Sequence, residues 1–404
     1  MSKILTLSNK TIKPSHEASS TWKKGKLGHL ITLESGQHLN PDEYSLSQET
    51  NALPYFTGPT DFTNEERDLT KWTTKGKKFG TLNSILITVK GSGVGSVYFL
   101  KLAKVAIGRQ LMSISAKDSS SVRFLYHLIQ TKQEQLVKLA TGNLIPGLTR
   151  DDILSLEVQE PSTDEQNKIG RLLDAWDSAI DKTQKLIDQI KLRNKGLAQQ
   201  LLTGKKRLKG FEGEWKKVSV GDVTENFSRR NNTLVDARIY SVTNSRGFVF
   251  QSDHFSREVA GEDLRSYKII RKGEFAYNPA RINVGSIAYF SEDVGIISSL
   301  YVCFRTNDLV EDEFLYYWLS LDKTKHDFET FGEGGVRIYL WYELFAKIKV
   351  MLPSVQEQRA IVALLRSAAE ELSRHEERLL QLKDQKKGLM QKLLTGEIRV
   401  KSAR

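Results

Sequence analysis

The feature that most constrains this chain is a long internal repeat. The segment from Pro161 to Gly204 returns 192 residues later, without a gap, as the segment from Pro353 to Gly396. Both copies begin with P-S-x-x-E-Q and end with L-L-T-G, and 17 of the 44 aligned residues are identical. A repeat of this length indicates that the chain contains two copies of one structural unit.

The similarity extends weakly into the segments that precede the two copies. Trp22-Lys23-Lys24 matches Trp215-Lys216-Lys217, and Val94-Gly95-Ser96-Val97 matches Val284-Gly285-Ser286-Ile287. With 404 residues the chain is long enough for two or three domains, and we predict a globule and a long helix in each half. The predicted divisions are an N-terminal arm at 1–20, a first globule at 21–160, a central long helix with its linker at 161–209, a second globule at 210–352, and a C-terminal long helix with a tail at 353–404.

Each repeated segment has the pattern of one long helix. Both copies open with S-x-x-E, the capping box in which the serine and the glutamate each accept a hydrogen bond from a free backbone amide. Both close with a glycine, which favours the left-handed turn that ends a helix. Between these marks apolar residues recur at alternating steps of three and four, which is the heptad pattern of a coiled-coil seam. The predicted seam consists of Ile169, Leu173, Trp176, Ile180, Ile187, Ile190, Leu197 and Leu201 in the first copy, and of Ile361, Leu365, Leu372, Leu379, Leu382, Leu389 and Leu393 in the second.

Polar residues interrupt the seam at matching places. Thr183 and Asn194 in the first copy correspond to His375 and Lys386 in the second. Because polar seam residues fix register and orientation, we predict that the two helices pair antiparallel within the chain, with pseudo-twofold symmetry. A parallel homodimer is the alternative that the seam pattern leaves open.

The globules have the patterns of mixed α/β folds. Runs rich in β-branched and aromatic residues predict strands at 84–89, 286–290 and 300–304, and helical patterns occur at 122–139 and 313–321. The expected fold class is therefore α+β, with two mixed α/β globules separated by two long helices that pair as an antiparallel coiled coil.

Composition excludes several classes of protein. No run approaches the roughly 18 to 20 apolar residues of a membrane helix, and the first residues lack the apolar block of a secretory signal, so we expect a cytoplasmic protein without membrane contact. The single cysteine, Cys303, excludes a disulfide framework and a cysteine-based zinc site within one chain. A net charge of +11 favours a polyanionic partner such as nucleic acid.

The sequence contains no complete catalytic motif. Gly91-Ser92-Gly93-Val94-Gly95-Ser96 lacks the spacing of a dinucleotide loop, and Tyr277-Asn278-Pro279-Ala280 departs at its last two positions from the N-P-P-aromatic motif of amino-methyltransferases. The seven histidines show no metal-binding spacing. We therefore expect a binding protein with no catalytic residue and no metal. The alternatives are a stand-alone DNA methyltransferase or nuclease with an unrecognised site, and a coiled-coil scaffold protein.

Basic residues are distributed unevenly between the globules. Segment 210–352 holds 18 lysines and arginines against 21 acidic residues, yet eight of its 10 arginines lie between Arg229 and Arg281. Lysine dominates the first globule around Trp72. The planar arginine group can grip a guanine edge or a phosphate with two hydrogen bonds, whereas lysine acts mainly as a point charge.

The arrangement as a whole resembles a known family. Two variable globules, each followed by a long helix with P-S-x-x-E-Q at its start and L-L-T-G at its end, are similar to the specificity subunit of a type I restriction and modification enzyme over about residues 20 to 400. The resemblance implies that each globule is a target-recognition domain, which reads one half of a bipartite sequence in double-stranded DNA. It also implies that the helix pair acts as a ruler and as docking sites for two modification (methyltransferase) subunits.

The same resemblance implies where the chemistry takes place. S-adenosylmethionine is expected in the partner methyltransferase subunits and no cofactor in this chain, and restriction (motor-nuclease) subunits join for cleavage. The two half-sites would flank an unread gap of roughly one DNA turn, about 34 Å. Within this mechanism the predicted DNA-binding residues of the first globule are Lys75, Lys77 and Lys78, and those of the second are Arg229, Arg230, Asn244, Arg246, Tyr277, Asn278 and Arg281. Tyr277 is expected to stack against an unstacked base and Asn278 to meet an adenine edge.

Overall fold

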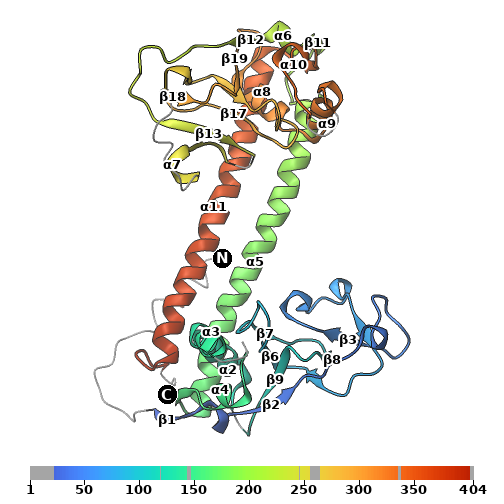
Figure 1. Ribbon diagram of the computed structural model, residues 1–404, viewed down its shortest axis with the longest axis vertical. Helices are drawn as coiled ribbons and strands as arrows, with labels where there is room; N and C mark the ends of the chain where they lie inside the picture. The colour runs from blue at the N-terminus through green and yellow to red at the C-terminus, as the bar shows by residue number, and fades with distance from the viewer. Residues whose placement is uncertain are drawn as a thin grey trace. The chain divides into compact units, whose positions relative to one another are not determined.

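The chain folds into two compact units. The computed structural model describes residues 22–118, 120–142, 147–244, 246–254, 264–334 and 338–400, so the predicted N-terminal arm at 1–20 lies outside the described residues. Unit 1 comprises Met1–Gln184 with Glu377–Arg404, and unit 2 comprises Lys185–Glu376. Each unit therefore combines one globule with a stretch of both long helices (Figure 1). Within the described ranges, no helix is both long and apolar enough to cross a membrane.

The globule of unit 1 contains two four-stranded sheets and a two-stranded ribbon. Its strands are β1 (Lys23–Lys26), β2 (Ile31–Ser35), β3 (Leu53–Phe56), β4 (Trp72–Thr73), β5 (Phe79–Thr81), β6 (Ile85–Thr88), β7 (Val97–Phe99), β8 (Lys104–Ile107), β9 (Leu111–Ala116) and β10 (Glu157–Glu160). Among the described residues its helices, apart from short 3-10 turns, are α2 (Val122–Thr131), α3 (Gln133–Gly142) and α4 (Arg150–Leu154). Alternate side chains of β6 face opposite sides, so Ile85 and Ile87 enter one core and Leu86 enters another.

The globule of unit 2 is built from corresponding elements. Its strands are β11 (Lys216–Ser219), β12 (Thr224–Phe227), β13 (Ile239–Thr243), β14 (Gly247–Phe250), β15 (Lys268–Arg271), β16 (Phe275–Tyr277), β17 (Ile287–Tyr289), β18 (Val294–Ile297), β19 (Val302–Thr306) and β20 (Lys349–Leu352). Its helices are α6 (Val220–Val223), α7 (Gln251–His254), α8 (Asp312–Leu319), α9 (Asp322–Phe331) and α10 (Tyr342–Phe345).

The two globules share one strand topology although their sequences have diverged. The order β2-β9-β6-β7 in unit 1 corresponds to β12-β19-β16-β17 in unit 2, and all of these neighbours are antiparallel. The order β4-β3-β8-β5 corresponds to β14-β13-β18-β15, and each of these sheets contains one parallel pair, β3 with β8 and β13 with β18. The ribbons β1-β10 and β11-β20 also correspond. The internal repeat thus covers the whole fold and not only the helices.

The repeated segments form two long helices, as predicted. Helix α5 (Thr163–Leu202) and helix α11 (Val355–Leu394) have 40 residues each, which corresponds to about 60 Å at 1.5 Å per residue. They are drawn in green and red in Figure 1. In unit 2, Lys191 pairs with Glu376 and Asn194 Nδ2 donates to the carbonyl of Ala368, so residue numbers rise along one helix as they fall along the other. The helices are therefore antiparallel within this chain, as predicted.

The predicted seam is buried or half-buried along its length. The seam residues next to the globules also belong to the globular cores: Ile169 and Leu393 pack in unit 1, and Leu201 and Ile361 pack in unit 2. Lys386 is buried at a seam position and donates to Asp177 at 2.5 Å. The ten buried seam residues are Ile169, Leu173, Ile187, Ile190, Leu201, Ile361, Leu365, Leu379, Leu382 and Leu393, and the half-buried ones are Trp176, Ile180, Leu197, Leu372 and Leu389.

In unit 1 a tryptophan, a glutamate and an arginine interact at the start of α5, and we call this group of side chains a clamp. Arg399 donates from Nε and Nη2 to the Glu165 carboxylate, at 2.7 Å each, and Trp22 Nε1 donates to the same carboxylate at 3.0 Å. The Arg399 guanidinium lies over the Trp22 ring, which also covers Gly396 at a φ of +79°. Burial raises the pKa of Glu165, but the hydrogen bonds from Arg399 and Trp22 outweigh it and hold the pKa below its ordinary value.

Unit 2 repeats this clamp with its own residues. Arg207 donates to Glu357 at 2.6 and 2.7 Å and lies over Trp215, which covers Gly204 at a φ of +71°. The capping-box prediction is therefore half right. The serines do cap, since the Glu165 amide donates to Ser162 Oγ at 3.4 Å, but the glutamate carboxylates bind arginines because these offer charged partners.

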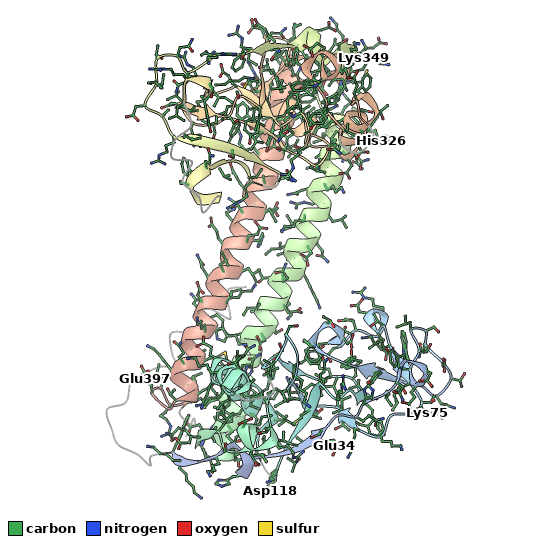
Figure 2. The ribbon with its side chains drawn as sticks, in the orientation of Figure 1. Glu34, Lys75, Asp118, His326, Lys349 and Glu397 are labelled. Carbon is green, nitrogen blue, oxygen red and sulfur yellow. The ribbon has the colours of Figure 1, made fainter. Side chains whose placement is uncertain are left out.

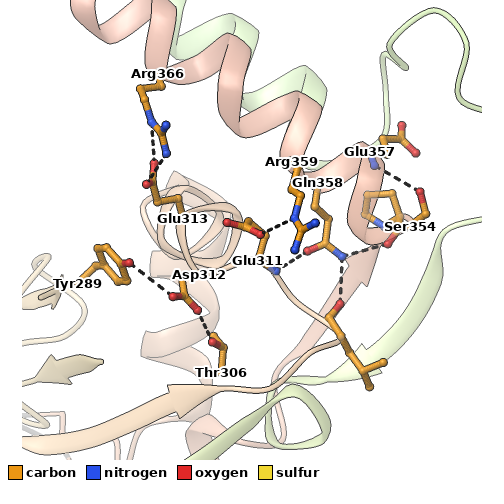
Figure 3. A network of polar contacts seen from close by, with 12 residues as sticks. Tyr289, Thr306, Glu311, Asp312, Glu313, Ser354, Glu357, Gln358, Arg359 and Arg366 are labelled. Carbon is orange, nitrogen blue, oxygen red and sulfur yellow. Dashed lines mark hydrogen bonds and ion pairs between the residues drawn. The ribbon is translucent and has the colours of Figure 1, made fainter. Parts of the chain in front are cut away.

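A buried glutamine joins each long helix to its globule. Gln358 Oε1 accepts from the amide of Glu311, and its Nε2 donates to the carbonyls of Leu309 and Pro353 (Figure 3). In unit 1, Gln166 likewise accepts from the Ser121 amide and donates to a proline carbonyl. These bonds satisfy buried backbone groups, which explains why a glutamine ends the P-S-x-x-E-Q segment in both copies.

The remaining strand and helix predictions are right in kind and shifted at their ends. The strands predicted at 84–89, 286–290 and 300–304 appear as β6, β17 and β19, and the helix at 313–321 appears as α8. The predicted helix at 122–139 is wrong as one element, because the chain turns at Lys132 between α2 and α3. This turn brings Leu136 and Ala140 into the same core as Phe124.

Candidate nucleic-acid interface

The predicted lysines of unit 1 share one exposed turn between β4 and β5. Gln37 holds this turn in place, since its Oε1 accepts from the amides of Lys77 and Lys78 and its Nε2 donates to the Lys75 carbonyl. Lys75 lies at the periphery of the globule (Figure 2). Lys78 pairs with Glu34 at 2.5 Å, so part of its charge is already balanced. Lys75 and Lys77 thus present their charges on a turn whose backbone is fixed.

In unit 2 the structure brings four predicted residues onto two adjacent turns. Asn244 and Arg246 are exposed on the β13–β14 turn, and Arg281 is exposed on the turn that follows β16, with Asn278 half-buried at its start. The turns touch, because a Cβ on Gly285 would lie 3.2 Å from the backbone oxygen of Asn244. This pair of turns offers guanidinium and amide groups suited to base edges or phosphates.

Asn278 shapes its turn through its own side chain. Its Oδ1 accepts from the amide of Ala280 at 3.0 Å, and its backbone carbonyl accepts from the amide of Arg281. The Asn278 oxygen is therefore engaged in holding the loop that carries Arg281. A position behind Arg281 fits this geometry better than a direct adenine contact.

The two neighbouring arginines, Arg229 and Arg230, differ in their surroundings. Arg229 donates from both terminal nitrogens to the buried carboxylate of Glu274, at 3.0 and 3.2 Å, and lies over Phe227. Both terminal nitrogens of the Arg229 guanidinium are thus already bound to Glu274 within unit 2. Arg230 is exposed beside β15, where it forms a backbone bridge with Lys268.

Tyr277 is not part of any surface, so the expected base stacking is wrong for this structure. The side chain is fully buried and packs with Phe304 and Phe345 in the core of unit 2. Burial raises the pKa of its hydroxyl, which has no hydrogen-bond partner among the described residues. The physical reason is the alternation along β16, where Phe275 and Tyr277 point to the same core. The internal repeat contained this signal, because Tyr277 aligns with the core residue Ile87.

An exposed aromatic pair near Arg281 was missed by the sequence reasoning. Tyr339 and Trp341 stack with ring centroids 6.4 Å apart, and both remain exposed, at 38% and 48%. The amide of Leu340, between them, donates to the Pro279 carbonyl, which ties this extended segment to the turn that carries Arg281. The available signal was two aromatic residues spaced by two, which places both on one side of an extended segment.

One cluster in unit 1 has the residue types of a metal site. His127, Asp174 and Asp177 bring potential ligand atoms within 4.8 Å of one another. However, Arg123 pairs with Asp174 at 2.8 Å and Lys386 with Asp177 at 2.5 Å. Since both carboxylates already pair with cations, the cluster is best described as a polar network that links α2, α5 and α11.

The family of the chain follows from a comparison with known proteins. A model of the type I restriction modification DNA specificity domain matches residues 19–192 and again residues 212–383. The chain belongs to this family of type I specificity subunits. The two matches correspond to the two halves of the internal repeat, so the specificity domain is present twice.

Individual relatives agree with the assignment as a specificity subunit. The type I restriction enzyme MjaVIII specificity subunit of Methanocaldococcus jannaschii is 22% identical over 344 residues, which cover 79% of this chain and 80% of that protein. The putative MjaX specificity subunit of the same organism is 25% identical over 309 residues, covering 69% and 68%. The crystal structure of a type I S subunit from M. genitalium is similar in fold, with a TM-score of 0.59 at 19% identity over 95% of this chain and 99% of that one.

Proposed function

We propose that this specificity subunit reads a bipartite DNA target, with one half-site bound by each globule. The observation that carries the proposal is the pairing of one topology with two different exposed surfaces. Unit 1 presents the Lys75–Lys78 turn, whereas unit 2 presents Arg246, Arg281 and Trp341 on adjacent loops. Because the two globules share one strand topology but expose different side chains, the two half-sites should be unrelated in sequence.

In unit 2 each exposed group has a distinct part in this proposal. Arg281 and Arg246 carry unpaired guanidinium groups among the described residues and suit guanine edges or phosphates. Trp341 and Tyr339 offer aromatic faces beside them, which suit a sugar or an unstacked base. Asn278 acts as a positioning residue for Arg281. Arg229, bound to Glu274, supports the frame.

The chemistry takes place in partner subunits under this proposal. The chain binds no cofactor and performs no catalysis, two modification subunits bring S-adenosylmethionine and transfer the methyl group, and restriction subunits join for cleavage. The long helix pair, α5 with α11, would set the gap between the half-sites. Support comes from the family of specificity subunits and from continuous helices of 40 residues, which suit a spacer.

Sequencing of methylated sites in a host that carries this chain with its modification partner tests the proposal. We expect two short unrelated sequences that flank an unread gap. Arg281→Ala should relax one position in one half-site, at a cost of about 1 to 3 kcal/mol in binding, and leave the other half-site unchanged. Trp341→Ala should weaken recognition of the same half-site. A continuous or palindromic motif, or methylation by this chain without partners, would contradict the proposal.

A further inference from the structure

A groove in unit 1 lies between the β1-β10 ribbon, the end of α2 and the last turns of α11. Its volume is about 840 Å³. Leu128, Val158 and Leu394 line it although each is largely buried, so they form an apolar floor. A recessed apolar floor of this kind suits an apolar side chain of a ligand. We call this feature the unit 1 groove.

The walls of the unit 1 groove carry positive charge. Lys24 and Lys26 come from β1, and Lys132 follows the last residue of α2. Glu157 on β10 is the single acidic residue among the described residues that line the groove. None of the three lysines forms an ion pair with another described residue. The described part of the chain therefore leaves this positive charge unbalanced.

Unit 2 shows how a lysine at a matching place is balanced inside the chain. Lys195 on α5 is the counterpart of Lys387 on α11, and it pairs with Asp322 at 2.8 Å. Asp322 lies at the junction of α8 and α9, whereas the junction of α2 and α3 carries Lys132. Lys387, one helical turn before Gln391 of the groove, has no ion pair in the described part of unit 1. Unit 1 thus has cations where unit 2 has an ion pair.

Elsewhere the two halves differ in charge without losing balance. Arg123 on α2 pairs with Asp174 on α5 at 2.8 Å. Their counterparts pair with the charges reversed, Glu313 on α8 with Arg366 on α11, at 2.6 Å (Figure 3). Both members of the pair differ together, so the ion pair is present in each unit. Packing within the chain therefore does not account for the unbalanced lysines of the groove.

The rest of unit 1 does not supply an acidic ligand for the groove. Outside the described residues, unit 1 comprises residues 1–21, 119, 143–146 and 401–404. These contain five lysines and arginines and one acidic residue, Glu17. A segment that balances the lysines therefore comes from another molecule.

We propose that the unit 1 groove binds one acidic polypeptide segment of another protein. Carboxylates of this segment pair with Lys24, Lys26 and Lys132, and an apolar side chain contacts the floor. A polypeptide fits better than DNA, because a phosphate backbone has no apolar group for a recessed floor. One segment binds per chain, since unit 2 has Ser219 in place of Lys26 and balances Lys195 internally. This partner is additional to the DNA that the two globules read.

Fluorescence anisotropy with labelled peptides tests the inference on the full-length chain. The probes are short peptides in which glutamate and aspartate alternate with leucine or phenylalanine in different orders. At least one of them should bind the wild type, with one peptide per chain, and its affinity should fall as the salt concentration rises. Peptides with lysine in place of the acidic residues, or with serine in place of the apolar ones, should bind at least about tenfold more weakly.

Replacement of two lysines locates the binding site. Lys26→Ser together with Lys132→Ser should weaken peptide binding at least about tenfold. Neither lysine is buried, so the variant should fold, which circular dichroism checks. Should it not fold, Lys26→Gln with Lys132→Gln keeps the aliphatic stems and should show the same loss. Lys216→Ser with Lys217→Ser, two exposed lysines on β11 of unit 2, is the matched control and should leave the affinity unchanged.

Four results would overturn the inference. They are the binding of two peptides per chain, an equal loss of affinity in the unit 2 control, unchanged affinity in the folded unit 1 variant, and a set of probes in which no acidic peptide binds. A loss of DNA affinity in the unit 1 variant that matches its loss of peptide affinity would assign the groove to DNA instead. The half-sites methylated in a host should be the same for this variant and the wild type, so the proposed function is tested separately.

Discussion

Removal of the Arg399 side chain tests how much its ion pair with Glu165 stabilises unit 1. The Arg399→Ala change deletes two charge-assisted hydrogen bonds of 2.7 Å and leaves the Glu165 carboxylate, whose side chain is 9% exposed, without its cation. Loss of one partner from a fully buried pair costs about 3 to 5 kcal/mol. Because the Arg399 side chain is 31% exposed, water screens the pair, and we expect about 2 to 3 kcal/mol instead.

Hydrogen exchange on the full chain is the suitable assay, because two units need not unfold as one cooperative system. Amide protection in β1, in β10 and at the start of α5 should fall by about 30- to 150-fold, which corresponds to 2 to 3 kcal/mol at 1.4 kcal/mol per factor of ten. Arg207→Ala is the matched control and should lower protection in β11 and β20 only. Unchanged exchange in β1 after Arg399→Ala would refute the reasoning, as would an equal loss in both units.

Three further outcomes are expected. Leu379→Ala should destabilise unit 1 by about 2 to 3 kcal/mol because the side chain is buried, whereas Leu380→Ala, at 62% exposure, should change the unfolding free energy by less than about 0.5 kcal/mol in denaturant titrations. Since the folded pKa of Glu165 is lowered, its stabilisation should be complete above the unfolded value near 4.5 and should disappear as the pH falls through the folded pKa; β1 exchange against pH measures this, and Glu165→Gln should abolish that dependence. Joint replacement of Lys75 and Lys77 by alanine should weaken binding to all DNA sequences and reduce the salt slope by about two, and an unchanged slope would contradict phosphate contacts.

The helical part of the fold could be predicted because one interaction recurs along it. The heptad pattern specifies a buried face at each step, and the predicted seam is buried or half-buried from Ile169 to Leu393. The glycines that follow the two helices were predictable for a different local reason. Gly204 and Gly396 adopt positive φ, which other residues rarely do. The heptad spacing and the glycine signal were therefore sufficient to predict where the two long helices run and end.

The sheets and the surface of the candidate site were harder to predict because they depend on distant segments. Tyr277 is of a residue type that can stack on a base, but the pairing of β16 with β17 and β19 places its side chain in the core. Glu165 has the spacing of a capping residue, yet its partner Arg399 lies 234 residues away. Trp341 becomes a candidate only when the hydrogen bond from Leu340 to Pro279 brings its segment to the turn that carries Arg281.

The two clamps show that the internal repeat includes the arginine that binds the start of each long helix. The chain, however, brings this arginine to its glutamate by a different route in each unit. Arg207 and Arg399 occupy the same place after L-L-T-G, and each binds the glutamate of the P-S-x-x-E-Q segment in its own unit. In unit 2 the arginine belongs to the linker that leads directly into the globule, whereas in unit 1 it arrives from the far end of the chain. The segment that follows α11 and carries Arg399 therefore completes the first globule. Changes near the C-terminus should consequently affect the half-site read by unit 1 and leave the half-site read by unit 2 intact.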